Sequence, residues 1–248
     1  MRPNRYDFQL GSVEDWPNLQ QMDWRAKCAV VIPCLNERLR IGPLVQSAVV
    51  HVNTIYVVDD GSTDGTGESA LRAGGEVLRH EATRGKGAAL RTGWDQARRV
   101  GFAWVLTMDG DGQHSPDDIP AFFECVERTS AALVVGNRMN TAARMPWLRR
   151  SVNRWMSRRL SGLAGQELPD SQCGFRLMDL NALANVSIDT THFEIESEVL
   201  LGFVRGGYRV QFIPIRVIYK AEQSKIQPFR DALRWFRWWW RAQRSDGN

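Results

Sequence analysis

From Cys28 onward, short continuous apolar runs alternate with longer amphipathic segments, and this alternation restricts the fold more than any other feature of the chain. The apolar runs cover residues 28–32, 55–58, 102–107 and 131–135, and the amphipathic segments cover residues 39–50, 64–73, 87–100 and 117–129. Short apolar runs of this kind are typical of strands buried on both faces by helices. The sequence therefore predicts an α/β fold, Rossmann-like, with a mostly parallel sheet flanked by helices.

The 248 residues, 43% of them hydrophobic, suffice for one sizeable core. We expect an irregular N-terminal extension over residues 1–26, one domain over residues 27–220, and a basic, tryptophan-rich amphipathic tail over residues 221–248. Within the second half of the domain, the pattern predicts amphipathic helices over 147–163 and 194–205 and an alternating strand over 213–219.

The four cysteines form no CxxC pair, which favours a reduced compartment. The N-terminus has no apolar leader, and no run approaches the ~20 apolar residues that a membrane span requires. We expect a cytoplasmic protein, either soluble or peripheral on the cytoplasmic face of a membrane. The formal net charge of +4 is too small to indicate nucleic-acid binding by itself.

Polar clusters follow the predicted strands: PCLNER, DDGSTDGT, DGDGQHSP and GNR. In open α/β sheets, ligands bind beyond the carboxyl ends of the strands, so these four clusters indicate one shared site.

The most informative cluster is Asp109-Gly110-Asp111, which follows the apolar run FAWVLTM. Two carboxylates separated by a glycine can approach one hard cation, and Gln113 offers a further oxygen. Oxygen ligands favour Mg²⁺ or Mn²⁺, which would bridge the phosphates of a nucleotide. The alternative interpretation is a solvated turn, because Asp and Gly are common turn residues.

Two further segments suit a nucleotide. Asp60 could accept hydrogen bonds from a base or a ribose, although the DDGSTDGT segment could also serve only as a turn and helix cap. Lys86, in the segment RGKG, could neutralise phosphate at a helix N-terminus. The segment matches neither a Walker A nor a dinucleotide fingerprint, and its glycines fit close helix–sheet packing equally well.

These motifs, together with DSQCGFR, resemble those of family 2 glycosyltransferases of the GT-A fold in order and spacing, over roughly residues 29–219. They are most similar to the enzymes that make dolichyl-phosphate and other polyprenyl-phosphate sugars. The resemblance implies an inverting hexosyl transfer from a nucleotide-diphosphate sugar, such as a UDP- or GDP-sugar, to a polyprenyl phosphate.

The resemblance also implies roles for individual residues. The nucleotide pocket would contain Pro33, Asn36 and Glu37, with Asp60 at the base. Asp109 and Asp111 would place the ribose and the metal, with Gln113 as a further ligand. Arg138 and Arg176 would face the donor diphosphate or the acceptor phosphate. A hydroxyl acceptor would need a general base, for which Glu194 and Glu196 are the candidates; Glu194 stands where relatives often have Asp.

Two basic, aromatic stretches, residues 147–163 and 225–244, remain outside these motifs. In the first, the predicted apolar face contains Leu148, Val152, Trp155, Met156, Leu160 and Leu163. Each stretch could contact a membrane surface, pack on the core, or form an interface in a homo-oligomer. For the tail we favour an interface or oligomer contact, because three consecutive tryptophans cannot share one helix face.

Two other classes stay open at this point. A sugar-nucleotide nucleotidyltransferase also uses an α/β sheet and paired aspartates, and it would release pyrophosphate rather than a nucleoside diphosphate. A non-catalytic adaptor with a degenerate nucleotide-sugar fold would bind no nucleotide. Nucleic acid is not an expected partner, since the predicted site is acidic.

Overall fold

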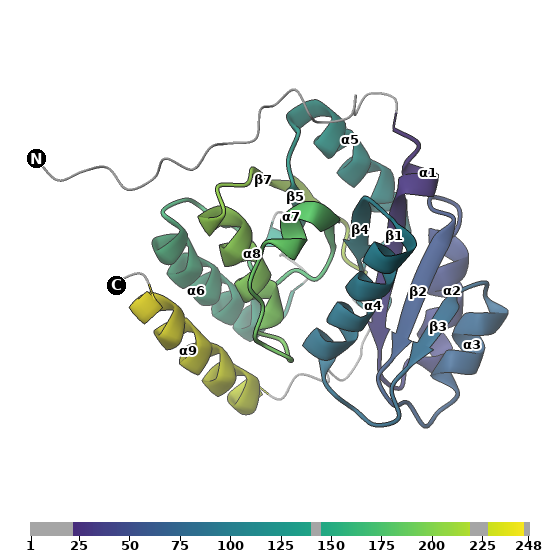
Figure 1. Ribbon diagram of the computed structural model, residues 1–248. Helices are drawn as coiled ribbons and strands as arrows, with labels where there is room; N and C mark the ends of the chain where they lie inside the picture. The colour runs from purple at the N-terminus through teal and green to yellow at the C-terminus, as the bar shows by residue number, and fades with distance from the viewer. Residues whose placement is uncertain (1–21, 140–144, 219–227, 246–248) are drawn as a thin grey trace, which may run out of the picture.

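The computed structural model describes residues 22–139, 145–218 and 228–245 (Figure 1). Within these residues, seven strands form one sheet in the order β3-β2-β1-β4-β6-β5-β7. The strands are β1 Cys28–Cys34, β2 Thr54–Asp59, β3 Glu76–Arg79, β4 Trp104–Thr107, β5 Leu133–Asn137, β6 Arg176–Asp179 and β7 Val210–Pro214. Strand β6 runs antiparallel to both β4 and β5, and the other pairings are parallel. The predicted α/β fold with a mostly parallel sheet is confirmed.

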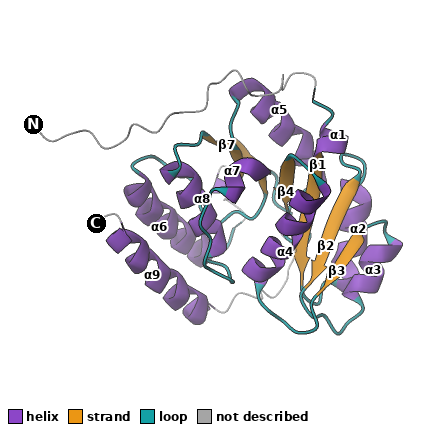
Figure 2. Cartoon of the chain, in the orientation of Figure 1, coloured by secondary structure: helices purple, strands orange, loops and turns teal. Residues whose placement is uncertain are grey.

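Helices cover both faces of this sheet (Figure 2). They are α1 Trp24–Lys27, α2 Arg38–Ala48, α3 Thr66–Arg72, α4 Lys86–Val100, α5 Ile119–Thr129, α6 Trp147–Ala164, α7 Leu180–Ala184, α8 Ile195–Arg205 and α9 Pro228–Ser245, with a 3₁₀ turn at Pro116–Asp118. Because side chains alternate along a strand, Val58 of β2 faces α4, whereas Val57 faces α2. This layering brings the carboxyl ends of β1, β2 and β4 to one edge.

Helix α4 approaches the sheet closely at Gly93. A Cβ atom there would lie 2.4 Å from Val31 Cγ1 and 3.2 Å from Val58 Cγ2. We expect Gly93→Ala to lower the free energy of unfolding by about 1–3 kcal/mol, because overpacking outweighs the gain in helix propensity. The matched control is Gly162→Ala in α6, where nothing lies within 4 Å of the added Cβ. Urea unfolding should show the control unchanged or stabilised; equal destabilisation of both variants would contradict the packing argument.

Several sequence-based predictions differ from the structure. The pattern gave no indication of β3, α7 or β6; the last of these begins inside the predicted loop DSQCGFR. The predicted strand over 213–219 is wrong in its bounds, because β7 ends at Pro214. Beyond it, Val217 forms an isolated bridge with His114 and Ile218 N–H donates to Gln113 O. The alternation therefore reflects an extended connection along the DGDGQH loop; Tyr219 lies outside the described residues.

The N-terminal side of the sheet is closed by Trp24, which was predicted to lie in an irregular extension. Trp24 instead begins the short helix α1, and its ring stacks on Phe123 at a centroid distance of 4.6 Å. Its Nε1–H donates to Glu127 at 2.6 Å. A buried indole with a satisfied N–H anchors this end of the chain to α5. Residues 1–21, the rest of the predicted extension, lie outside the described part.

Helices α6 and α9 lie side by side next to α8 (Figure 1). The buried residues of α6 are Asn153, Ser157 and Leu160, so the predicted apolar face is wrong for its first half: Leu148, Val152 and Trp155 are exposed. The polar residues are buried because they make hydrogen bonds to the segment Asp170–Ser171.

The tryptophan-rich helix α9 packs on its own chain. Trp235, Trp238 and Trp239 are buried, whereas Trp240 is 48% exposed. Trp235 Nε1–H donates to Ser197 Oγ of α8 at 2.8 Å, and the Trp155 and Trp235 rings lie 5.5 Å apart. The prediction that the tail mainly forms an interface or oligomer contact is therefore wrong for the face of α9 that contains these three buried tryptophans. Residues 221–227 of the predicted tail lie outside the described residues.

Candidate active site

The Asp109-Gly110-Asp111 turn follows β4 directly and lies against the end of β1. A Cβ atom at Gly110 would lie 2.5 Å from Cys34 Sγ and 3.1 Å from Pro33 O, so glycine permits this approach. Gly174 plays a similar part from the other side, since its Cβ would lie 2.7 Å from Asp109 Oδ1. The turn is therefore held between β1 and the segment leading into β6.

Lys86, the first residue of α4, is bound to one carboxylate of this turn and to one of α8. Its Nζ lies 2.5 Å from Asp109 Oδ1 and 2.5 Å from Glu196 Oε1. Burial alone would lower the pKa of the ammonium, but the two carboxylates outweigh burial and raise it. Burial would likewise raise the pKa of Asp109, whereas the Lys86 ammonium holds it well below its usual range. Lys86 is thus charged and paired at neutral pH.

His114 supports Asp109 from the buried side of the loop. The Asp109 N–H donates to His114 Nδ1 at 3.3 Å, and the imidazole ring stacks on Phe175 at 5.1 Å. Burial lowers the pKa of His114 to about 4, so the ring is neutral at physiological pH. Its role here is to position the turn.

Of the two carboxylates of the turn, Asp111 is the one without a direct ion pair among the described residues. Its Oδ1 accepts the Gln113 N–H at 3.0 Å, and no salt bridge reaches it within the described part of the chain. Burial and the neighbouring Asp109 carboxylate raise the pKa of Asp111 to about 6. A carboxylate of this kind is well suited to receive a cation.

The residues of the acidic turn supply only some of the ligands that a divalent cation needs. Across residues 22–139, 145–218 and 228–245, no three His, Cys, Asp or Glu side chains come together as a complete metal site. Asp111 is open to a ligand, Gln113 is adjacent, and Asp109 is engaged by Lys86. The oxygen donors fit Mg²⁺ or Mn²⁺, with further ligands left for a substrate's phosphates.

The predicted nucleotide pocket is built from the ends of β1 and β2. Asn36, in the left-handed region with φ of 52°, accepts the Thr63 N–H at 3.0 Å and donates its own N–H to Ser62 Oγ at 2.9 Å. Glu37 is buried and pairs with Arg40 at 2.7 Å. Pro33 lies at the end of β1 with its carbonyl beside Gly110. These contacts join the PCLNER and DDGSTDGT loops into one rigid edge.

Asp60, predicted to contact a base, binds a neighbouring loop in this structure. Its Oδ1 accepts the Arg84 N–H at 2.9 Å and pairs with His80 Nδ1 at 2.7 Å, and its Oδ2 accepts the Gly85 N–H at 2.8 Å. Asp60 therefore fixes the loop that presents Lys86.

The glycines of RGKG serve packing. A Cβ at Gly87 would lie 2.6 Å from the Thr191 carbonyl carbon, and Ala88 N–H donates to Thr191 O. The predicted phosphate cradle at this helix start is thus occupied by the 191–194 segment, although Lys86 itself reaches the site.

The two arginines predicted to face phosphate are bound within the protein, which corrects that expectation for this structure. Arg138 is buried and forms a two-pronged pair with Asp170, at 2.8 Å from both Nε and Nη2. Arg176 is 2% exposed and donates to the carbonyl oxygens of Ser171, Cys173 and Glu196. Both guanidinium groups hold the DSQCGFR segment in place.

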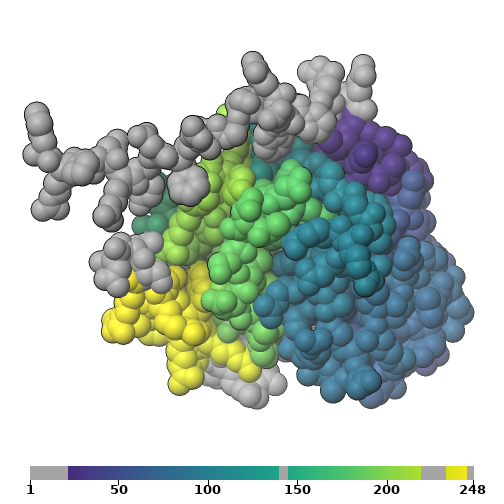
Figure 3. Space-filling model, in the orientation of Figure 1, coloured from purple at the N-terminus to yellow at the C-terminus, as the bar shows by residue number. Residues whose placement is uncertain are grey.

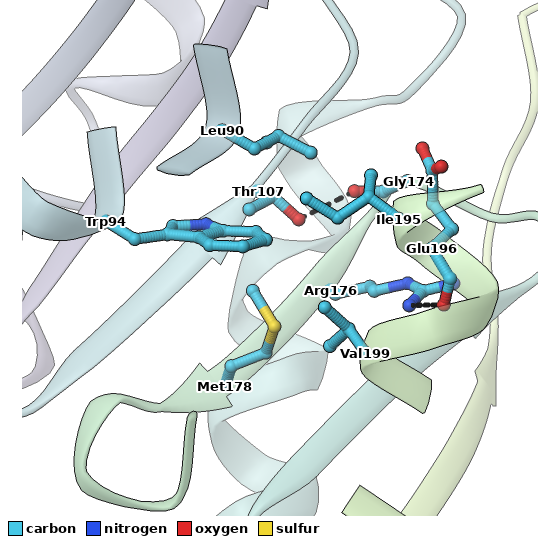
Figure 4. Close-up of a pocket in the computed structure, with 9 residues that line it drawn as sticks. All are labelled: Leu90, Trp94, Thr107, Gly174, Arg176, Met178, Ile195, Glu196 and Val199. Atoms are coloured by element: carbon cyan, nitrogen blue, oxygen red, sulfur yellow. Dashed lines mark hydrogen bonds between the residues drawn. The ribbon is translucent and has the colours of Figure 1, made fainter. Parts of the chain in front are cut away.

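The two candidate bases differ in their surroundings. Glu196 turns its carboxylate away from the small pocket behind it, while its backbone carbonyl accepts from Arg176 (Figure 4). Its carboxylate is already paired with Lys86. Glu194 is buried at the start of α8, and its Oε2 has no hydrogen-bond partner among the described residues. Glu194 therefore keeps a carboxylate oxygen without a hydrogen-bond partner in the described residues, whereas the carboxylate of Glu196 is engaged by Lys86.

Sequence reasoning missed three supports of the site: Asp170, Asn153 and His80. Asn153 donates to Asp170 at 3.0 Å, and His80 bridges Asp60 to Thr92. Asp170 belongs to the segment PDSQCGFR, so this motif could have indicated that Asp170 matters for the site. The pairing of Asp170 with Arg138 depends on tertiary structure and is not visible in the sequence.

Comparison with known proteins identifies the family. The sequence profile described as glycosyl transferase family 2 matches residues 29–186. The chain belongs to glycosyl transferase family 2. This family 2 glycosyltransferase is 30% identical to a polyprenol monophosphomannose synthase of Mycolicibacterium smegmatis, over 75% of each protein. It is 29% identical to a UDP-N-acetylglucosamine–dolichyl-phosphate N-acetylglucosaminyltransferase of Methanococcus voltae, over 77% of this chain and 85% of that protein.

Solved structures agree on the fold. Glucosyl-3-phosphoglycerate synthase of Mycobacterium tuberculosis, crystallised with Mn²⁺, UDP-glucose and phosphoglyceric acid, superposes with a TM-score of 0.65. The likeness covers 88% of this family 2 glycosyltransferase and 79% of that chain at 20% identity. The expected GT-A fold is thus confirmed. No helix in the described ranges is both long enough and apolar enough to cross a bilayer.

Proposed function

We propose that this enzyme transfers a hexose from a UDP- or GDP-sugar to a polyprenyl phosphate, with inversion at the anomeric carbon and with Mg²⁺ or Mn²⁺ as cofactor. The observation that carries the proposal is the Asp109-Gly110-Asp111 turn after β4, where Lys86 pairs with Asp109 and Glu196 while Asp111 makes no ion pair among the described residues. The names of the two enzymes above, both polyprenyl-phosphate sugar transferases, support the acceptor class.

Asp109, Asp111 and Gln113 would hold the cation, and Asp109 would also contact the donor ribose. When bound, the cation neutralises the charge that builds on the departing diphosphate. The pocket edge made by Asn36 and Glu37 is already hydrogen-bonded to residues 62, 63 and 66 without the donor, which would reduce the ordering needed on binding.

The acceptor step requires no strong base when the acceptor is a phosphate. An anionic phosphate oxygen forms the new bond to the anomeric carbon while the bond to the diphosphate breaks on the opposite side, and no proton moves. Arg149 is the cation placed for such an acceptor, because its Nη1 lies 3.5 Å from Gln113 Oε1 and its helix borders the acidic turn. A hydroxyl acceptor would instead call on Glu194, whose Oε2 is unpaired among the described residues.

An exposed basic and aromatic surface on α6 and α9 supports the lipid acceptor. The exposed apolar side chains of α6 and α9 are Trp147, Leu148, Val152, Trp155, Leu233, Phe236 and Trp240. Helix α6 contains no acidic residue, and Arg154, Arg158, Arg237 and Arg244 are exposed beside these side chains. Figure 3 shows α9 forming the surface at this end of the molecule. A basic surface with aromatic side chains fits the interface of a bilayer that contains anionic lipids. We therefore place the enzyme peripherally, on the cytoplasmic face.

Membrane binding has a direct test. We expect the protein to sediment with phosphatidylglycerol vesicles and far less with phosphatidylcholine vesicles. The double change Trp147→Ser with Leu148→Ser should reduce sedimentation several-fold, since both side chains are more than half exposed. Leu71→Ser, equally exposed at 58% but on α3, is the control. Unchanged sedimentation of the α6 variant would instead favour contact with a second copy of the chain, to be checked by light scattering.

The donor is tested by a calorimetric screen of UDP- and GDP-sugars with Mn²⁺ or Mg²⁺. Binding of one nucleotide series that depends on the cation supports the proposal. Absence of binding by every nucleotide sugar, with a folded protein, would leave only a non-catalytic adaptor.

A further inference from the structure

Lys86 neutralises a carboxylate that the proposed cation also needs. Its ammonium is held between Asp109 and Glu196 at 2.5 Å from each, and its side chain is only 16% exposed. The Phe193 ring covers it at 5.6 Å. Two short, sheltered ion pairs of this kind are not weakened by solvent as surface pairs are.

This arrangement divides the acidic turn into two halves. Asp109 pairs directly with the Lys86 ammonium, whereas Asp111 accepts an amide hydrogen bond from Gln113 and makes no ion pair among the described residues. A divalent cation that arrives alone therefore finds one available carboxylate and a neighbouring ammonium that repels it. Repulsion between two positive charges a few ångströms apart in a partly buried site lowers the affinity for the divalent cation by about tenfold or more.

A nucleoside diphosphate changes this balance. Its phosphate oxygens supply ligands to the cation, and they also offer the ammonium an anionic partner other than Asp109. The Lys86 stem begins at a fixed helix start, held by Asp60 through the Arg84 and Gly85 amides, so only its flexible end has to move.

We infer that Lys86 acts as an internal competitor for the divalent cation, so that the free enzyme binds the cation weakly and binds it tightly only together with the donor. This inference rests on the proposed function. Lys86 is then a positioning residue that couples cation binding to donor binding. By linkage, the factor by which a nucleoside diphosphate raises Mn²⁺ affinity equals the factor by which Mn²⁺ raises nucleotide affinity.

The test compares Mn²⁺ binding to wild type and Lys86→Met, measured from the free Mn²⁺ signal in electron paramagnetic resonance, with and without UDP or GDP. We expect Lys86→Met to bind Mn²⁺ alone at least about tenfold more tightly than wild type, and the enhancement by nucleotide to shrink by a similar factor. Arg98→Met, which removes an exposed charge from the same helix, should behave as wild type. Circular dichroism checks that each variant is folded.

A second measurement uses the wild-type protein alone. The chain has four lysines, so ¹⁵Nζ spectra are simple, and Lys86 is the one held by two carboxylates in the described residues. Its signal should move when Mg²⁺ is added with the nucleoside diphosphate, and stay in place when the same concentration of Mg²⁺ is added alone. Tight Mn²⁺ binding by nucleotide-free wild type, or equal Mn²⁺ affinity in Lys86→Met and wild type, would overturn the inference while leaving the proposed function intact. No Mn²⁺ binding even with nucleotide would overturn both.

Discussion

Asp111→Asn is expected to lower turnover by roughly 10³-fold while making the cation-free protein more stable. Asp111 is the carboxylate that the structure leaves open for the cation, and loss of one electrostatic stabiliser of a developing charge costs about 10²–10³ in rate. The measurement is nucleoside diphosphate release at saturating Mn²⁺. The control is Asp117→Asn, which removes an exposed carboxylate close by along the chain. Near-normal turnover of Asp111→Asn would remove Asp111 from the metal role.

The stability effect of this substitution has a definite pH dependence. Asp111 has a pKa of about 6, above its ordinary value of about 3.9, so between these values the folded state binds more protons than the unfolded state. The contribution of Asp111 to stability therefore falls as pH rises through this window. In the presence of EDTA, the variant should come close to wild type near pH 4 and exceed it by about 3 kcal/mol at pH 7. Equal stabilities at pH 7 would show that the carboxylate is not strained.

Asp170→Asn is expected to cost about 3–5 kcal/mol of unfolding free energy, because it leaves the buried Arg138 guanidinium without its counter-charge. Asp170 is fully buried and also accepts from Asn153 of α6, so the change loosens the contact between α6 and the DSQCGFR segment. Urea unfolding measures the loss. The double variant Arg138→Met with Asp170→Leu, which removes both charges, should recover part of it.

The same pair predicts sensitivity to acid. Burial would raise the pKa of Asp170, but Arg138 outweighs it and lowers the pKa below its usual value. The contribution of this pair is therefore complete above the unfolded-state value of about 3.9 and is lost as pH falls through the lower folded-state value. Wild type should lose stability below pH 4 more steeply than the double variant. Parallel curves would show that the pair does not govern acid unfolding.

The sequence predicts the part of the fold that depends on local pattern. Four buried strands and six helices were expected near their observed bounds, because amphipathic periodicity marks the helices and apolar runs such as residues 28–32 mark strands buried on both faces. Strand β3 has charged ends and half-buried centres, so no apolar run marks it. Strand β6 depends on pairing with β4 and β5, which are distant along the chain. Such pairing is visible only in three dimensions.

The sequence predicted which residues form the candidate site better than it predicted which partners those residues bind. The motifs placed Asp109, Asp111, Lys86 and Glu196 in one region, and the structure brings Lys86 to both Asp109 and Glu196. It did not follow from the sequence that Arg176 would donate to three backbone carbonyls. The residue type indicates that an arginine can bind an anionic ligand. Whether its guanidinium reaches such a ligand or binds other parts of the protein depends on how deeply the folded chain buries it.

The most direct measurement of the central claim is a product assay with purified enzyme, a polyprenyl phosphate and the nucleotide sugar selected by calorimetry. We predict that glycosyl polyprenyl phosphate and nucleoside diphosphate form in equal amounts, with inverted anomeric configuration, only when Mn²⁺ or Mg²⁺ is present, and that EDTA stops both. Release of pyrophosphate from a nucleoside triphosphate and a sugar phosphate, or sugar transfer unaffected by EDTA, would contradict the account.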